Sequence, residues 1–140
     1  MNHTTMTPRK LLQFDSDISS AGRAYEILKP LQDLEVEELW ALALGPSLKL
    51  LDAQMIFRGT VNTCLTHPRE IFRFALLSNA SNIIIAHNHP SQERSPSSED
   101  IETTKQLVLV GKFIEIPLLD HLLIVRSSYF SFRENGWCEF

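Results

Sequence analysis

The spacing of apolar residues changes repeatedly along the chain between helical and strand patterns. Apolar residues three or four apart mark one face of a helix, and short apolar runs bounded by turn residues indicate buried strands. Helices are predicted over residues 19–31, 67–77 and 97–111. Strands are predicted over residues 39–44, 48–58, 60–65, 83–86 and 114–125. The first two strands flank a Gly-Pro-Ser turn and predict an antiparallel hairpin. Because helices and strands interleave, the sequence predicts an α/β fold with one mixed central β-sheet flanked by helices.

Length and composition indicate one globular domain. The chain has 140 residues, of which 44% are hydrophobic and 21% are charged, close to the averages for a folded domain. Residues 1–17 are polar and are predicted to form a flexible N-terminal segment, followed by a single domain over residues 18–140. The N-terminus lacks the apolar stretch of a signal peptide, and no apolar run is long enough to cross a bilayer, so we expect a cytoplasmic protein with no membrane contact.

Charge and cysteine content argue against two classes of protein. The formal net charge is -4 and the pI is about 5.7, which does not favour general affinity for a nucleic-acid backbone. Cys64 and Cys138 are too few and too far apart for a disulfide framework, and neither belongs to a CxxC pair. We interpret them as one buried thiol and one thiol near the C-terminus.

Two histidines directly follow a buried strand. The apolar run 83–86 is succeeded by His87 and His89. Side chains two residues apart on a strand point the same way, so the two imidazoles lie side by side where the strand leaves the sheet. Zinc favours histidine nitrogens at ~2.0–2.1 Å, and Pro90 ends regular strand pairing. The spacing therefore indicates two ligands of a metal site.

A catalytic zinc centre needs a third protein ligand and an open position for water. Asp100 lies eleven residues after His89, in the first turn of the next predicted helix, and can fold back towards the strand end. Glu93 and Glu99 are the competing carboxylates. Ser97 and Asp100 also resemble a capping box, in which Asp100 would serve the helix start. Both interpretations of Asp100 stay open at this point.

The other histidines carry less information. His121 follows Asp120 within an apolar predicted strand, and we interpret the two as a buried, hydrogen-bonded Asp–His pair. Support of a metal-bound histidine is the alternative role for His121. His67 precedes a predicted helix and is interpreted as structural.

Several positions together resemble a known metal motif. The motif of the JAB/MPN metalloprotease superfamily, also called JAMM, is similar to three short pieces of this chain: His87-Asn88-His89-Pro90, Pro96-Ser97 and Asp100. The flanking residues 66–72, 86–91 and 117–122 resemble most closely those of the RadC-like JAB domains. The resemblance covers about residues 36–136 and implies a single JAB/MPN-type domain.

The resemblance assigns a role to each site residue. It implies that His87, His89 and Asp100 hold one Zn²⁺ ion per chain. It also implies that the Ser97 hydroxyl hydrogen-bonds the developing oxyanion or the metal-bound water. The implied function is a zinc-dependent hydrolase that activates water to cleave an amide bond, peptide or isopeptide, in a protein or peptide substrate of unknown identity.

The family also uses an upstream glutamate as general base. Glu38, at the entry to the first predicted strand, is the best match, and Glu37 and Glu35 are close rivals. Neighbouring strand residues face opposite sides of a sheet, so a shift of one residue reverses the face. The choice of Glu38 depends on the resemblance alone.

Two departures from the family pattern affect the expectations. Gln92 and Glu93 stand where many relatives have Gly-Asp, which predicts a stiffer loop. Longer RadC-like proteins carry an N-terminal helix-hairpin-helix region, for which this chain is too short. The alternative function is a DNA-repair-associated or mobile-element accessory protein acting on or near DNA. The acidic charge and the missing region do not favour direct DNA binding.

Overall fold

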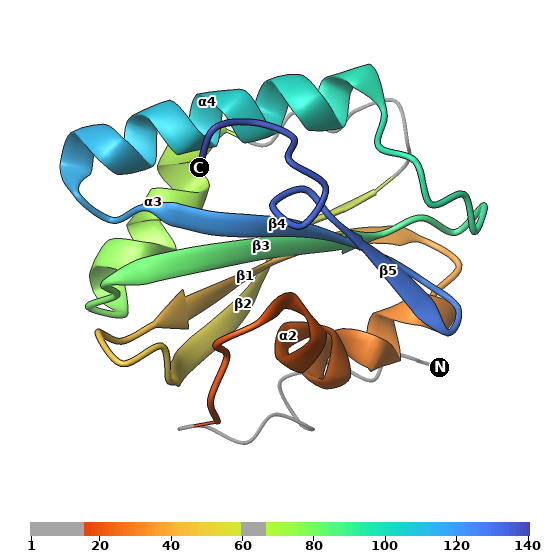
Figure 1. Ribbon diagram of the computed structural model, residues 1–140, viewed down its shortest axis with the longest axis horizontal. Helices are drawn as coiled ribbons and strands as arrows, with labels where there is room; N and C mark the ends of the chain where they lie inside the picture. The colour runs from red at the N-terminus through yellow and green to blue at the C-terminus, as the bar shows by residue number, and fades with distance from the viewer. Residues whose placement is uncertain (1–15, 60–66) are drawn as a thin grey trace.

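The computed structural model describes residues 16–59 and 67–140, which form a five-stranded sheet with helices on both faces (Figure 1). The elements in chain order are α2 (Ala21–Leu28), the 3₁₀ helix η1 (Lys29–Asp33), β1 (Glu37–Leu44), β2 (Leu50–Gly59), α3 (Pro68–Leu77), β3 (Asn82–Asn88), α4 (Ser98–Ile114), β4 (Leu118–Val125) and β5 (Ser128–Ser131). The strand order is β2-β1-β3-β4-β5. Among the strands that the structure describes, only β3 and β4 pair in parallel, so the sheet is mixed, as the sequence predicts.

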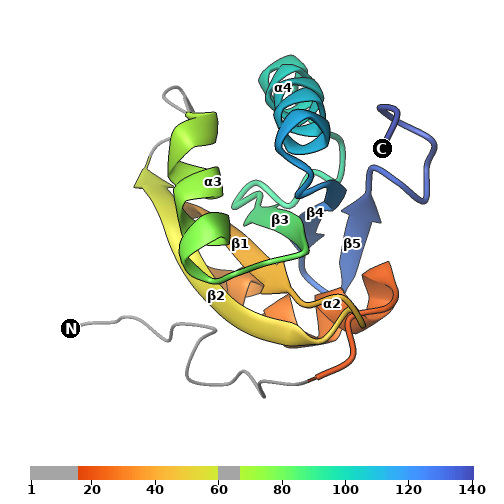
Figure 2. The same cartoon turned by 90° about the vertical axis from the view of Figure 1, so that its left-hand side faces the viewer.

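The curved sheet separates two layers of helices (Figure 2). Strand β1 is buried along its whole length, and its side chains alternate between the two layers. Leu39, Ala41 and Ala43 pack in the core with α3 and α4. Trp40, Leu42 and Leu44 pack in the core with α2 and η1. The face on which a β1 residue lies therefore decides which layer it meets.

Helix α4 connects the two parallel strands and runs over the sheet, with its first turn at the end where β3 finishes (Figure 1). Its close packing near the other end depends on Gly111. A Cβ atom at Gly111 would lie 2.7 Å from the carbonyl oxygen of Ile116 and 3.1 Å from the backbone nitrogen of Leu118. The helix ends at Glu115, which adopts a left-handed conformation with φ 63°.

The structure confirms the predicted hairpin of β1 and β2 and shifts several boundaries. Strand β3 continues through Asn88, beyond the predicted end at residue 86, because the chain stays paired with β4 although its side chains become polar. The predicted strand 114–125 begins only at Leu118, because Ile114 still belongs to α4. Strand β5 was not predicted, since its four residues contain only two aromatic residues between serines and give too short a pattern to indicate a strand.

The start of the chain is only partly described. The predicted strand 60–65, Cys64, and most of the predicted flexible segment 1–17 lie outside the described residues. Ser16 and Asp17 are described, and the pair joins the sheet's edge: Asp17 forms a bridge with Lys49, and the Ser16 carbonyl accepts a hydrogen bond from Leu50. None of the helices within the described residues is long and apolar enough to span a membrane.

Candidate metal centre

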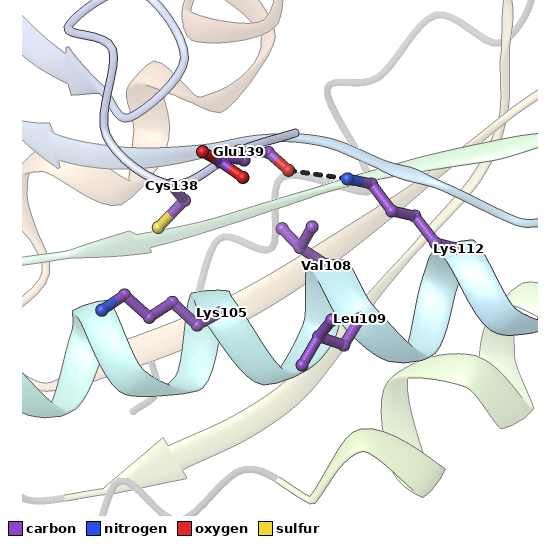
Figure 3. A pocket seen from close by; sticks show the side chains of 6 residues that line it. All are labelled: Lys105, Val108, Leu109, Lys112, Cys138 and Glu139. Atoms are coloured by element: carbon purple, nitrogen blue, oxygen red, sulfur yellow. Dashed lines mark hydrogen bonds between the residues drawn. The ribbon is translucent and has the colours of Figure 1, made fainter.

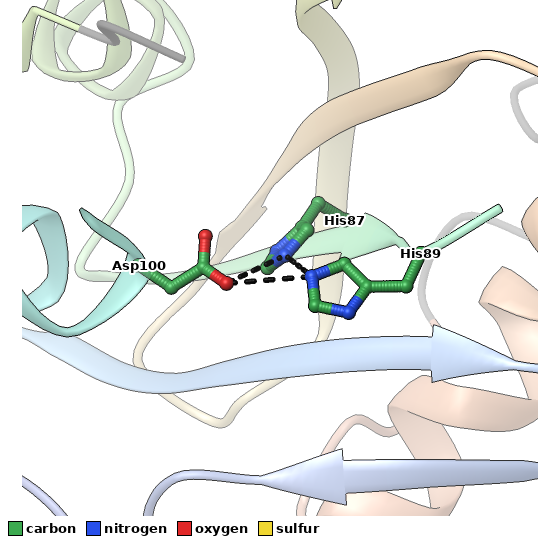
Figure 4. Close-up of side chains that lie close together, drawn as sticks. All are labelled: His87, His89 and Asp100. Carbon is green, nitrogen blue, oxygen red and sulfur yellow. Dashed lines mark hydrogen bonds and ion pairs between the residues drawn. The ribbon is translucent and has the colours of Figure 1, made fainter. Parts of the chain in front are cut away.

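Three side chains converge beyond the end of β3 (Figure 4). His87 lies on the face of β3 that packs against α3 and α4, together with Ile83 and Ile85. His89 follows the strand and is held there by a hydrogen bond from its backbone N–H to the Ile124 carbonyl. Asp100 is in the first turn of α4. The structure thus brings the three predicted ligands together.

The three ligand atoms have the spacing of a metal site. His87 Nε2 and His89 Nε2 are 3.0 Å apart, and each lies 3.4 Å from Asp100 Oδ2. Tetrahedral zinc with bonds of ~2.0–2.1 Å separates its ligand atoms by about 3.3–3.4 Å. The observed separations are close to that value, so two imidazole nitrogens and one carboxylate oxygen fit around a single small cation.

The cluster is buried on one side and open on the other. The side chain of His87 is 2% exposed, whereas that of His89 is 15% exposed. Glu93 and Glu99, the competing carboxylates, are exposed and are not part of the cluster. A ligand would therefore approach the cluster from the side of His89.

Electrostatics in the cluster favour positive charge. Burial alone would raise the pKa of Asp100, but hydrogen bonds with His87 and His89 outweigh burial and hold that pKa far below its usual range. Burial alone would lower the pKa of His89. Hydrogen bonds to Asp100 and to the Glu93 carbonyl, together with the charges of Asp100 and Glu37, reverse this effect and raise it. The lowered pKa of Asp100 and the raised pKa of His89 indicate a place where positive charge is stabilised.

Asp100 serves the helix start as well as the cluster. The Asp100 backbone N–H donates to Ser97 Oγ at 3.0 Å, and the Ser97 backbone N–H donates to Asp100 Oδ2 at 2.9 Å. This is the complete capping box that the sequence suggested. The two interpretations of Asp100 are compatible, because the bond that caps α4 also orients the carboxylate towards the histidines. Ser97 itself is exposed beside the cluster.

Glu38 does not reach the histidines. Its Oε1 accepts a hydrogen bond from Trp40 Nε1 at 2.9 Å, and its Oε2 lies 3.5 Å from Arg58 Nε. Residue 38 shares its face of β1 with Trp40, on the α2 side of the sheet, whereas His87 faces α4. Alternation places Glu37 on the histidine face, and the charge of Glu37 contributes to the raised pKa of His89. Of the two neighbouring glutamates, Glu37 therefore lies on the face of the sheet that carries the histidines.

Asn88, between the two histidines, fixes the start of β1. Its Oδ1 accepts a hydrogen bond from the Glu38 backbone N–H at 2.7 Å, and its Nδ2 donates to the Val36 carbonyl at 3.1 Å. These two bonds hold the main chain on both sides of Glu37. Sequence reasoning missed this role. The available signal was a polar residue between two histidines on a strand, which must point to the opposite face.

Asp120 and His121 form a hydrogen bond as predicted, but it joins the Asp120 side chain to the His121 backbone and not to the His121 ring. Asp120 Oδ1 accepts from the His121 backbone N–H at 2.7 Å. The His121 ring lies on the other face of β4, because adjacent strand residues point in opposite directions. There its Nε2 is 2.8 Å from His87 Nδ1, its Nδ1 is 2.6 Å from Thr104 Oγ1, and the ring stacks on Phe132. The ring therefore contacts His87, one of the three candidate ligands, as the alternative interpretation requires.

Two hollows on the outer side of the helices lie apart from the cluster. One, of about 420 Å³, lies between α4 and the C-terminal residues Cys138 and Glu139, where the Glu139 carbonyl accepts a hydrogen bond from Lys112 (Figure 3). The other, of about 590 Å³, lies between α3 and α4 and is lined mainly by apolar side chains, among them Phe72 and Ile114. Neither hollow contains a residue of the cluster.

Comparison with known proteins identifies the family. A family model described as RadC-like JAB domain matches residues 18–137. The chain is 38% identical over 121 residues to a UPF0758 protein of Symbiobacterium thermophilum, an alignment that covers 86% of this chain and 52% of that protein. It is 43% identical over 119 residues to a UPF0758 protein of Aquifex aeolicus, covering 85% of this chain and 52% of that protein.

A third relative shows higher identity over a shorter region. A UPF0758 protein of Thermosynechococcus vestitus is 48% identical over 98 residues, which cover 70% of this chain and 39% of that protein. The chain spans about half the length, or less, of these relatives. The names of the relatives state no activity. The match over residues 18–137, together with the arrangement of the histidines and Asp100, shows that this chain belongs to the RadC-like JAB domain family.

Proposed function

We propose that this chain is a zinc-dependent hydrolase that cleaves an amide bond, peptide or isopeptide, in a protein or peptide substrate. One observation carries the proposal: three ligand atoms, two from imidazoles and one from a carboxylate, lie 3.0–3.4 Å apart at a partly open site. Catalytic zinc is commonly bound by two histidines and one carboxylate, with a further position for water. Membership of a family that is generally hydrolytic supports the same conclusion.

When bound, zinc would lower the pKa of a coordinated water from about 15.7 to about 7 and polarise a substrate carbonyl. His87, His89 and Asp100 hold the ion. Proton transfer and hydrogen bonding to the substrate would fall to side chains around them, and we assign these roles to Glu37 and Ser97.

Glu37 is the proposed general base, in place of Glu38. It is 8% exposed and lies on the same face of the sheet as His87. In amide hydrolysis the oxygen of water bonds to the carbonyl carbon as the carbon–nitrogen bond breaks. Glu37 accepts the proton that the water loses and returns it to the leaving amine nitrogen.

Ser97 is the proposed hydrogen-bond donor to the substrate carbonyl oxygen. Its hydroxyl oxygen already accepts the backbone N–H of Asp100, which fixes the position of the side chain at the N-terminus of α4. The hydroxyl hydrogen is then available for a substrate oxygen, and the positive end of the helix dipole favours charge developing there.

Zinc content tests the metal. Purified protein is exposed to zinc, dialysed and analysed by mass spectrometry for the metal. Wild-type protein should retain about one zinc per chain, and His87→Ala and Asp100→Ala should retain almost none. A wild-type protein that retains no zinc would overturn the proposed function.

Substrate and base are tested together. A library of unstructured peptides, some of them joined through lysine isopeptide bonds, is incubated in ¹⁸O-labelled water, and hydrolysis places ¹⁸O in the new carboxyl group. The adjacent pair Glu37→Gln and Glu38→Gln is the matched comparison: only Glu37→Gln should abolish cleavage while zinc is retained. The reverse result would restore Glu38 as the base. Plasmid DNA serves as a second substrate, and its cutting by wild-type protein but not by His87→Ala would assign phosphodiester hydrolysis instead.

A further inference from the structure

A buried chain of hydrogen-bonding groups connects the outer nitrogen of His87 back to α4. His87 Nδ1 lies 2.8 Å from His121 Nε2, and His121 Nδ1 lies 2.6 Å from Thr104 Oγ1. Thr104 Oγ1 in turn lies 2.7 Å from the backbone carbonyl oxygen of Asp100. His87, His121 and Thr104 are all 2% exposed or less. Solvent therefore has little access to these groups.

The hydrogen bond between Thr104 and the Asp100 carbonyl decides which atom donates and which accepts in the other two hydrogen bonds of the chain. A carbonyl oxygen only accepts, so the single hydrogen of the Thr104 hydroxyl is donated to Asp100. Thr104 Oγ1 must then accept from His121 Nδ1–H. A neutral imidazole has one N–H, and a buried ring beside other imidazoles is costly to charge. His121 Nε2 is therefore the acceptor, and His87 Nδ1–H is the donor to it.

The reverse assignment of donors and acceptors in this chain of hydrogen bonds is unfavourable. If the Thr104 hydroxyl donated to His121, its oxygen and the Asp100 carbonyl oxygen would face each other at 2.7 Å with no hydrogen between them. His121 would then donate to His87 Nδ1, and the hydrogen of a neutral His87 ring would sit on Nε2. That nitrogen, which lies 3.4 Å from Asp100 Oδ2, could not bind a metal.

A separate hydrogen bond places a hydrogen on Nδ1 of His89 as well. Its Nδ1 lies 2.9 Å from the Glu93 carbonyl oxygen and must donate to it. Both histidines therefore have Nδ1 engaged as a donor and present Nε2 towards Asp100 Oδ2, the position at which zinc would bind. For His89 one carbonyl is sufficient, whereas for His87 the result depends on two further side chains.

We propose that His121 and Thr104 are positioning residues that hold His87 in the tautomer with Nδ1 protonated, and thereby set the affinity of the cluster for zinc. The proposal rests on the proposed zinc site. It also gives Asp100 two connected tasks, since its carboxylate faces the metal position and its carbonyl anchors the chain that orients His87. Loss of such outer hydrogen bonds costs about 10–100-fold in metal affinity.

The tautomer is read directly from the metal-free wild-type protein. Long-range ¹H–¹⁵N NMR correlation at about pH 8, above the ordinary histidine pKa, distinguishes protonated from unprotonated ring nitrogens. We expect a hydrogen on His87 Nδ1, and a hydrogen on Nδ1 but not on Nε2 of His121. A hydrogen on His121 Nε2 with none on His87 Nδ1 would overturn the proposal without any variant having to fold.

Zinc affinity is measured by competition with a chelator. Thr104→Val removes the hydroxyl at nearly constant size and should weaken zinc binding about 10–100-fold. Thr104→Ser keeps the hydroxyl and should bind zinc within a few-fold of wild type. The matched control is Thr103→Val, the same change one residue earlier on α4, where affinity should not change. His121→Phe should weaken binding, and His121→Gln, which keeps one donor and one acceptor, should restore part of it.

The outcomes separate the two claims. Wild-type protein that does not bind zinc would overturn the proposed function and this inference with it. Wild-type and Thr104→Val proteins that bind zinc equally well would overturn only the positioning role and leave the zinc site intact. A loss of affinity that Thr103→Val shares would also count against the positioning role, because a general effect on α4 would then explain the result.

Discussion

The side chain of Asn88 offers the sharpest test of how the site is held together. Asn88→Ala removes one acceptor and one donor that bind the main chain of β1. The Glu38 N–H then loses its partner in a buried setting, since Glu38 is 6% exposed. The Val36 carbonyl loses its partner where water is closer, since Val36 is 36% exposed. The two lost bonds are therefore unequal.

The expected cost follows from that inequality. A buried donor left without a partner costs about 1–3 kcal/mol, and an ordinary hydrogen bond that water can replace contributes about 0.5–1.5 kcal/mol. Together Asn88→Ala should lower the free energy of unfolding by about 1.5–4.5 kcal/mol. For a domain of this size the corresponding fall in melting temperature is about 3–4 °C per kcal/mol, or about 5–18 °C in all.

Urea unfolding measures the loss in the free energy of unfolding. Hydrogen exchange of the Glu38 amide measures the loss of its own hydrogen bond. That amide should exchange at least tenfold faster in Asn88→Ala than in wild-type protein, because its acceptor is gone. The control is Asn82→Ala, at the other end of β3, where a partly exposed side chain is removed and stability should change by about 0.5 kcal/mol or less. Equal losses in the two variants, or an unchanged Glu38 amide, would refute the role given to Asn88.

Three further predictions concern the metal, the pH dependence and the loop after His89. Zinc at about 100 times its Kd should stabilise wild-type protein by about 2.7 kcal/mol, and differential scanning calorimetry should show no such gain for His87→Ala. In metal-free protein, the lowered pKa of Asp100 contributes stability that is present above its unfolded pKa of about 3.9 and is lost as the pH falls further. The raised pKa of His89 contributes stability that is present below about 6.5 and is lost as the pH rises through its folded pKa. Urea titrations should therefore show the largest contribution of this pair between about pH 4 and 6.5, and Asp100→Asn should flatten the profile. Gln92 has a left-handed backbone with φ 68°, and its Oε1 accepts the Arg126 backbone N–H at 2.7 Å. Gln92→Ala and Gln92→Gly both lose that bond, but only glycine relieves the strain, so Gln92→Gly should be the more stable of the two by about 0.5–1 kcal/mol in urea unfolding.

The sequence was sufficient to single out the three candidate ligands, because local rules brought them forward and the family resemblance then selected Asp100 over Glu93 and Glu99. The apolar run before His87 defines a buried strand, and strand alternation then places His89 on the same side. Asp100 could be found because a helix start is visible in the residues around Ser97. Each step uses residues that are near one another in the chain.

The choice between Glu37 and Glu38 could not be made in the same way. An amphipathic strand reveals which face is which by alternating apolar and polar residues. Strand β1 is buried on both faces and is almost entirely apolar after Glu38, so its pattern contains no such alternation. The face of each glutamate becomes known only from pairing, in which Leu39 lies opposite His87.

The contact between His121 and Thr104 could not be predicted from the sequence, for a different reason. The two residues are 17 positions apart and meet only because α4 packs against β4. A threonine inside a helix commonly bonds the carbonyl four residues earlier, as Thr104 does with Asp100. Nothing in that local pattern indicates that its oxygen also accepts from a histidine on a strand.

The topology explains why these segments meet at one edge of the sheet. Strand β1 is antiparallel to β3, so the beginning of β1, with Glu37, lies beside the end of β3, with His87. Helix α4 follows β3 and must return over the sheet to begin the parallel strand β4, so its first turn, with Asp100, lies over the same edge. The tripeptide at the end of β3 then acts on both faces at once. Its histidines face the α4 layer and would hold the proposed metal, while Asn88 faces the other way and fixes the strand that carries the proposed base. The spacing between the proposed base and the proposed metal position is thus set largely by one short stretch of β3, and the loop after His89 contributes the Glu93 carbonyl that orients His89.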